Sequence, residues 1–330
     1  MRFSRVVLVS LVTLVAGWEP YALDESCPRA VLCNTGNAGL GDMLEHWVFC
    51  LRVAKMVEAT LVMPEAAFFG GGGHLGNTQY KEVASLLGVN LRLNESVLWA
   101  QPVTKPYEEL LDMRTRGESL PCGTILSVDI YSCAGRAIWC DSVLDSDILK
   151  SVLWVMRRNN AEEDCRQRGL AVPKEAGQVS VLFHVRKGDI CLRCNNVAYH
   201  EKIVGAIERA LASCHVSLRV RFESEDDLPE LRSAFPSALF THAHLVEAVC
   251  SFLTTDILIT PGSSFSPMIA AFGPPWKPIV FEERRKEGGG KAHFYTEEEA
   301  VLLQEGVPTL GEAELEGLLQ SALLQHCTSP

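Results

Sequence analysis

The sequence predicts an α/β protein with two domains, each built around a parallel β-sheet. The chain has 330 residues, about twice the length of a typical domain. Hydrophobic residues make up 47% of the chain and charged residues 22%, a globular balance that excludes a disordered or fibrous protein. Short apolar runs alternate with amphipathic stretches. Strands that are apolar throughout lie in parallel sheets covered by helices on both faces.

The first half of the chain opens with an apolar strand followed by a helix. Short apolar runs predict strands over Ala30–Thr35, Thr60–Pro64 and Thr124–Ile130. Amphipathic stretches predict a helix over Asp42–Val57 and one or two helices over Ser142–Arg166. The four consecutive glycines of Gly70–Gly73 suit neither a helix nor a strand, so we expect a mobile loop there.

The second half alternates more regularly. Val179–Arg186 is a continuous apolar strand that ends in charge, and Tyr199–Cys214 repeats its apolar residues at helical spacing. The other expected elements are strands over Leu218–Phe222, Ile257–Pro261 and Pro278–Phe281, and helices over Glu225–Phe235, Leu245–Thr254, Ser266–Phe272 and Glu312–Gln325. The pattern is interrupted near Leu170–Gln178, which predicts domains over residues 24–172 and 173–330.

The N-terminus predicts entry into the secretory pathway. Arg2 and Arg5 precede an apolar run over Val6–Trp18 that is too short to span a bilayer. A basic start before a short apolar stretch is typical of a signal peptide, here residues 1–17. The alternatives are an uncleaved Golgi signal-anchor, which would hold the protein at the membrane, and a buried core helix. With the glycosylation sequon at Asn94, we expect the ER or Golgi lumen, or secretion.

The twelve cysteines suit an oxidising compartment and predict disulfides, whose pairing the sequence leaves open. Cys191 and Cys194 form a CxxC motif. A structural zinc site would need a second ligand pair at regular spacing, and a thioredoxin-like site would open a helix after a strand. We therefore predict that these two cysteines bind no metal and lie in an oxidised loop.

The charge of the chain bears on its partners. The formal net charge is −11, and basic residues gather only in short stretches such as Arg157–Arg158 and Arg284–Lys286. This pattern argues against general nucleic-acid binding.

The segment His184–Asp189 closes the strand over Val179–Arg186, and ligands of open parallel sheets lie beyond the carboxyl ends of the strands. Alternation places His184 and Arg186 on one face of the strand. The Arg186 guanidinium is a planar cation that matches phosphate oxygens, and Gly188 lets the backbone approach a ligand. These features suit a nucleoside diphosphate; the alternative is a salt bridge between Arg186 and Asp189 at the strand end.

Two other strand ends carry candidate motifs. Gly262–Ser266 offers hydroxyls and N–H groups at a strand-to-helix turn, which suits phosphate or an ordinary N-cap. It lacks the G-x-S-x-G pattern of a serine hydrolase. Gly36–Asp42 reads G-x-x-G-x-G, the wrong order for the dinucleotide fingerprint, and leaves a tight glycine turn that could approach a ligand.

Together, the three motifs resemble those of the fucosyltransferase superfamily. His184–Asp189 is similar to its H-x-R-x-G-D motif, closest to the α1,2 branch, and Gly39–Met43 is similar to its early G-L-G-N motif. Asp256–Ser266 is similar to its late segment, and Phe222–Asp226 stands where the family has a strand and an S-D-D-like turn. The resemblance implies a GT-B fold, two Rossmann-like domains facing a cleft. It also implies inverting transfer from GDP-fucose to a glycan or glycoprotein acceptor, without metal or cofactor.

The resemblance also implies roles for individual residues. Arg186 and Asp189 would be catalytic, Arg186 as the diphosphate ligand. The expected donor-binding residues are His184, Arg186, Gly188, Asp226, Ser263, Ser264, Phe265, Gly39, Gly41 and Asp42. Asp226 would contact the guanine or ribose. The candidates for the base that deprotonates the acceptor are Asp189, Glu45, His46 and Asp42.

The chain also departs from the family pattern. Asp42 stands where asparagine is usual, and Lys187 replaces a second arginine. Two alternatives therefore stay open: a catalytically inactive relative that binds carbohydrate or nucleotide, and a transferase of the same fold that uses another nucleotide sugar.

Overall fold

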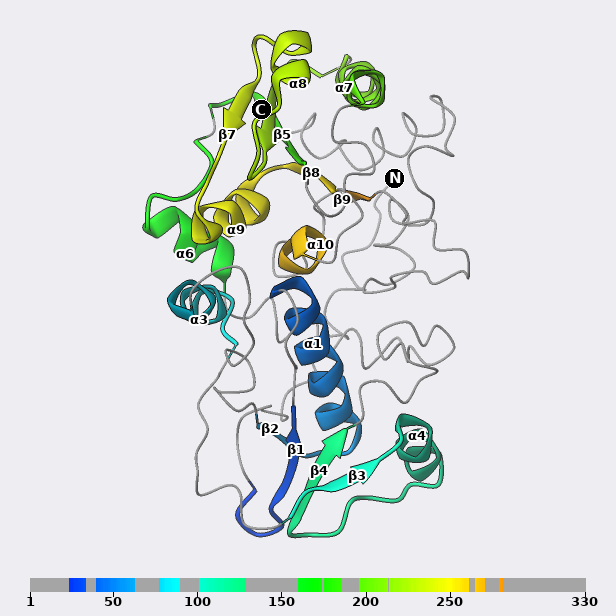
Figure 1. The fold of residues 1–330 in the computed structure, drawn as a ribbon. Coiled ribbons are helices and arrows are strands. Elements are labelled where there is room, and N and C mark those ends of the chain that lie inside the picture. Colours follow the sequence, from blue (N-terminus) through cyan, green and yellow to red (C-terminus); the bar gives the residue numbers. More distant parts are fainter. Residues whose placement is uncertain are drawn as a thin grey trace, which may run out of the picture. The chain divides into compact units, whose positions relative to one another are not determined.

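The computed structural model describes residues 24–33, 40–62, 77–89, 101–128, 160–173, 175–185, 196–212, 214–260, 265–270 and 279–281 (Figure 1). The described residues fall into two compact units. The first contains strands β1–β4, helix α4 and helix α1 from Met43 onward. The second contains β5–β9, α3 and α6–α10, together with the first turn of α1 at Leu40–Asp42.

The first unit has a four-stranded sheet in the order β2-β1-β4-β3, and every pair is parallel. Its strands are β1 (Arg29–Leu32), β2 (Thr60–Val62), β3 (Val103–Lys105) and β4 (Thr124–Val128), and its helices are α1 (Leu40–Met56) and α4 (Tyr107–Thr115). Ala30, Val62 and Ile125 form a buried cluster on three neighbouring strands. Two disulfides, Cys27–Cys122 and Cys33–Cys50, join the segments around β1 to those before β4 and within α1.

The second unit has a five-stranded parallel sheet in the order β7-β6-β5-β8-β9. Its strands are β5 (Gln178–His184), β6 (Ser217–Glu223), β7 (Leu239–Thr241), β8 (Ile257–Thr260) and β9 (Ile279–Phe281). Its helices are α3 (Asn77–Leu86), α6 (Ala161–Gln167), α7 (Val197–Leu211), α8 (Pro229–Ala234), α9 (Leu245–Thr254) and α10 (Phe265–Ala270).

The side chains of β5 point alternately to the two faces of the sheet. Val181 and Phe183 face the main core, where they pack with Ile203 and Ile207 of α7. Because consecutive strand residues point to opposite faces, Ser180, Leu182 and His184 project from the other face of the sheet, toward α9. A helix therefore covers each face, as the continuously apolar strands require.

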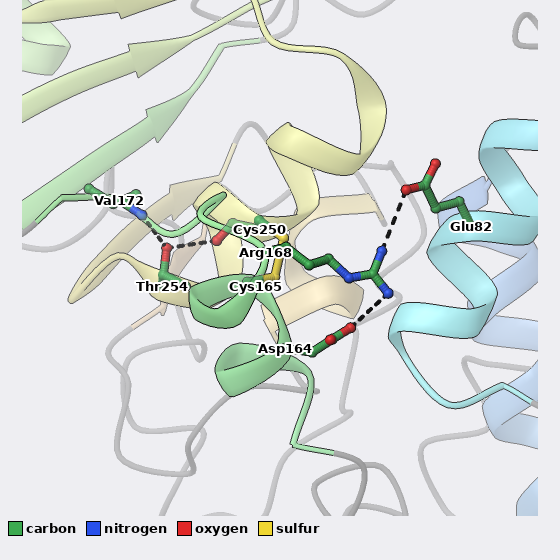
Figure 2. The surroundings of a disulfide bond; sticks show 7 residues. All are labelled: Glu82, Asp164, Cys165, Arg168, Val172, Cys250 and Thr254. Carbon is green, nitrogen blue, oxygen red and sulfur yellow. Dashed lines mark hydrogen bonds and ion pairs between the residues drawn. A yellow bond between two sulfur atoms is a disulfide. The ribbon is translucent and has the colours of Figure 1, made fainter.

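Helices α3 and α6 both pack against α9. Cys165 of α6 and Cys250 of α9 are fully buried and form a disulfide. Beside it, Arg168 pairs with Asp164 at 2.9 Å and with Glu82 of α3 at 3.5 Å, as Figure 2 shows. A covalent bond and an ion pair thus join three helices that are far apart in the sequence.

The predicted fold class is confirmed, because both units are α/β and both sheets are parallel. The expectation that both sheets face one cleft stays a prediction. The expected strands and helices that lie in the described ranges are present with ends shifted by a few residues, as for β5. The domain boundary at residue 172/173 also stays a prediction, although α3 and α6 precede it and lie in the second unit.

Four elements were missed by the sequence analysis: α3, β3, α4 and β7. Strands β3 and β7 have three residues each, too few for a period-two pattern to stand out. Residues 1–23, Gly70–Gly73, Asn94, most of Ser142–Arg166 and Glu312–Gln325 lie outside the described residues. No helix in the described ranges is long and apolar enough to cross a bilayer.

His200 of α7 is a histidine inside the core of the second unit. It is 4% exposed, its Nδ1–H donates to the Asn196 carbonyl oxygen at 2.9 Å, and its ring contacts Phe183 and Phe222. Burial lowers the pKa of His200 from its ordinary value, and the Asn196 hydrogen bond opposes this shift. The folded state therefore favours the neutral form of His200.

We expect the free energy of unfolding to decrease as the pH falls below about 6.5, the pH where the unfolded chain takes up a proton at His200. The stabilisation that comes from the neutral His200 is fully present above that pH. At pH 5.5 its loss lowers the free energy of unfolding by at most about 1.4 kcal/mol. Urea unfolding of wild type and His200→Leu at pH 7.5 and 5.5 measures it. The exposed His215 provides the control variant, His215→Leu. Equal pH dependence of wild type and His200→Leu would contradict the expectation.

Candidate functional site

The second sheet has a topological switch point between β5 and β8. From β5 the chain adds β6 and β7 on one side, and then β8 and β9 on the other (Figure 1). In open α/β sheets, ligands bind beyond the carboxyl ends of the strands where the order reverses. The residues that end β5 and β8, and those that open α10, therefore define the candidate site.

His184, the last residue of β5, is held from several directions. Its Nδ1 lies 2.9 Å from the hydroxyl oxygen of Ser266 in α10, and Ser266 is fully buried. The centroid of its ring lies 5.0 Å from that of Phe252 and 6.0 Å from that of Phe265. A hydrogen bond and two aromatic contacts fix the orientation of the imidazole. The structure thus brings together residues of two predicted motifs: His184 of His184–Asp189, and Phe265 and Ser266 of Gly262–Ser266.

The ends of β5, β6 and β7 are tied together by Glu223. Glu223 is 4% exposed, and its carboxylate accepts hydrogen bonds from the Thr241 hydroxyl and, at 2.9 Å, from the Ala243 N–H. Its backbone oxygen accepts a hydrogen bond of 2.8 Å from the N–H of Val185, directly after β5. This buried carboxylate positions the loop between β7 and α9.

Asp226 lies in the turn that follows β6. Its N–H donates to the hydroxyl oxygen of the buried Ser224 at 3.1 Å, and its own side chain is exposed. The structure therefore places Asp226 at the same edge of the sheet as His184. Its contact to guanine or ribose stays a prediction.

Arg221 of β6 is a buried cation on the face that carries His184 and Glu223. It is 7% exposed, and its buried Nη1 has no hydrogen-bond partner within the described ranges. Burial lowers the pKa of the Arg221 guanidinium, and the nearby Glu223 carboxylate acts in the opposite direction. Arg221 and Glu223 were not predicted as site residues, although polar residues at alternate positions of a strand are the signal of one polar face.

Asp256 opens the late motif but lies at the opposite end of the sheet from His184. Its carboxylate accepts hydrogen bonds from the N–H of Ser180 at 2.8 Å and from the Ser180 hydroxyl at 3.1 Å. The Thr255 hydroxyl donates to the Ser180 carbonyl oxygen at 3.1 Å. All three residues are buried, so this part of the motif joins β5 to β8 and has a structural role.

The glycine motif follows β1, at the point where the order of the first sheet reverses between β1 and β4. The structure places Gly41 and Asp42 in the first turn of α1 and Glu45 in the second. His46 of the same helix is 7% exposed. The choice among the candidate bases therefore stays open.

Other predicted site residues lie outside the described residues: Arg186, Gly188, Asp189, Ser263, Ser264 and Gly39, with Lys187, Cys191 and Cys194. Their roles stay predictions. In the part of the chain that the structure describes, no three His, Cys, Asp or Glu side chains are grouped as metal ligands.

The sequence matches no family model and no curated protein. Solved structures give matches at low identity. Fucosyltransferase NodZ from Bradyrhizobium has 16% identity over 79% of this chain and 97% of its own, with a TM-score of 0.41. NodZ α-1,6-fucosyltransferase soaked with GDP-fucose has 16% identity, 79% and 97% coverage and a TM-score of 0.43. E. coli heptosyltransferase WaaC with ADP has 11% identity, 89% and 99% coverage and a TM-score of 0.44. A likeness at this level supports no inference about substrate, residue roles or mechanism.

Proposed function

We propose that the chain is an inverting, metal-independent glycosyltransferase that moves fucose from GDP-fucose to a hydroxyl group of a glycan or glycoprotein. One observation carries the proposal. His184 and Ser266 stand 82 positions apart, in two motifs whose resemblance assigns them to one donor site, and they are hydrogen-bonded at 2.9 Å. They meet at the switch point of a parallel sheet, where such folds bind ligands.

The reaction needs two contributions from the protein, a base for the acceptor proton and a cation for the leaving diphosphate. The acceptor oxygen attacks the anomeric carbon of fucose from the side opposite the diphosphate, its proton passes to a base, and the electron pair of the broken C–O bond stays on GDP. Arg186, two residues after His184, would neutralise the charge that grows on the diphosphate. The base would be one of Asp189, Glu45, His46 and Asp42.

His184 supports this site as a positioning residue. Its ring is held by Ser266, Phe252 and Phe265, so the backbone where the chain leaves β5 is anchored. An anchored strand end gives the following residues, Arg186 among them, a fixed starting point. Preorganisation of this kind is what electrostatic stabilisation of a transition state requires.

Thermal-shift screening with GDP, UDP and ADP tests the proposal. We expect selective stabilisation by GDP, because ligand that binds the folded state raises the midpoint by mass action. At a GDP concentration 100 times the Kd, the stabilisation amounts to about 2.7 kcal/mol. Hydrolysis of GDP-fucose, and transfer when an acceptor is present, should accompany the binding.

The other outcomes identify the alternatives. GDP binding without turnover of GDP-fucose would indicate an inactive relative. Selective stabilisation by UDP or ADP would indicate another nucleotide sugar. No stabilisation by any of the three nucleotides would overturn the proposal as a whole.

A further inference from the structure

Thr260, the last residue of β8, carries a hydroxyl group that the fold does not use. It is 2% exposed, and its buried Oγ1 has no hydrogen-bond partner among the described residues. A buried hydroxyl is nearly always hydrogen-bonded, because taking it out of water without a partner costs free energy. Valine would fill the same space without that cost. The stability of the fold therefore does not explain why this position carries a hydroxyl group.

Register places Thr260 beside His184. Phe183 pairs with Ile259 in the β5–β8 ladder, so the next pair along the two parallel strands is His184 and Thr260. Residues paired in this way project from the same face of the sheet, with the strands about 4.8 Å apart. The Thr260 hydroxyl thus lies on the face where His184 binds Ser266, at the switch point of the sheet.

Thr255, at the other end of the same segment, is the natural comparison. It is 1% exposed, and its hydroxyl donates to the Ser180 carbonyl oxygen at 3.1 Å and lies 3.2 Å from the Ser180 hydroxyl. Thr255 lies two residues before β8 and Thr260 is its last residue, and both are almost completely buried. Of the two, Thr260, at the carboxyl end of the strand, lacks a hydrogen-bond partner in the part of the chain that the structure describes.

We propose that Thr260 is a donor-binding residue whose hydroxyl donates a hydrogen bond to a phosphate oxygen of the bound nucleoside diphosphate. The inference rests on the function proposed above. A phosphate is favoured over the base or the sugar because His184, the neighbour of Thr260, precedes the predicted diphosphate ligand Arg186 by two residues. Because Oγ1 is covered, binding must be accompanied by a small local rearrangement that lets the phosphate oxygen reach it.

The test is Thr260→Val, which removes the hydroxyl at nearly constant volume. We expect the affinity for GDP to fall about tenfold or more, because a hydrogen bond to a charged group is lost. Without ligand, we expect the melting temperature to rise by about 2–4 °C, because an unpaired buried hydroxyl is removed. Affinity for guanosine, which has no phosphate, should stay at the wild-type value.

Thr255→Val is the matched control, and its expected effects on melting temperature and GDP affinity differ from those of Thr260→Val. It should lower the melting temperature, because it breaks the Ser180 hydrogen bonds, and leave GDP affinity unchanged. Thr260→Ser keeps a hydroxyl and should retain most of the GDP affinity even if Thr260→Val proves less stable than wild type.

The results that would contradict the inference differ from those that would contradict the proposed function. Wild-type GDP affinity in Thr260→Val would overturn the inference and leave the proposed function standing. So would an equal loss of guanosine affinity, which would move the contact from the phosphate to the nucleoside. Loss of GDP affinity in both Thr260→Val and Thr260→Ser would show that the hydroxyl is not what matters. If wild type binds no nucleotide, the proposed function fails and the inference fails with it.

Discussion

Arg186→Ala should lower the turnover of GDP-fucose by about 10²–10³-fold while the protein stays folded. Arg186 follows the anchored His184 by two residues, and the sequence pattern predicts that both side chains lie on one face. The negative charge on the diphosphate is larger in the transition state than in the bound donor, so loss of the guanidinium should reduce turnover more than donor affinity. Turnover per folded molecule and the GDP affinity measure the two effects.

Two further variants sharpen this experiment. Arg186→Lys should recover little, because an ammonium cannot reproduce the bidentate fork of a guanidinium. Arg219→Ala is the control. Arg219 lies in the first half of β6, away from the carboxyl end of the strand, and donates to the Pro173 carbonyl oxygen at 3.0 Å. The contrary result is a lower melting temperature in both Arg186→Ala and Asp189→Ala with unchanged turnover, which would identify a salt bridge at the strand end.

Removal of the disulfide between α6 and α9 should cause a large loss of stability. Cys165 and Cys250 are separated by 85 positions, and in the chain-entropy description closing such a loop stabilises the folded state by about 4–5 kcal/mol. The double variant Cys165→Ala/Cys250→Ala should therefore show a lower free energy of unfolding by about that amount. Urea unfolding of the double variant and of wild type measures the difference.

The Cys33–Cys50 disulfide provides a comparison within the same chain. Its cysteines are 17 positions apart, so Cys33→Ala/Cys50→Ala should cost about 3 kcal/mol, less than the longer loop. Alkylation of the unfolded wild type before and after reduction shows whether Cys165 and Cys250 are paired. Free thiols at both positions, together with wild-type stability of the double variant, would contradict the prediction.

Strands and motifs could be predicted from the sequence where a short stretch of residues carries the pattern by itself. Continuous apolar runs located β5 and β8. The expectation that His184 and Arg186 share one face stays a prediction, because β5 ends at His184 and Arg186 lies outside the described residues. The motifs also lay at strand ends, as parallel sheets require. Asp256 is the exception, because a resemblance between motifs does not separate a residue that binds ligand from one that binds the neighbouring strand.

What the sequence could not show depends on contacts between distant segments. The missing partner of Thr260 and the hydrogen bonds that Glu223 makes with Thr241 and Ala243 follow from how the strands are assembled. The place of α3 depends on its packing against α9, which has no local signature. The local sequence indicates only which secondary structure one segment prefers, whereas these features depend on contacts between two segments.

The packing of α3 and α6 on α9 determines how the protein can be divided. A fragment that begins at Pro173 would lack Cys165 and leave Cys250 as a single thiol. It would also lack Glu82 and the two helices that pack against α9, so an apolar helix surface would meet water. Chimeras with related proteins joined at this position would inherit the same defect. A second half that folds alone, or exchanges cleanly, must therefore carry α3 and α6 with it.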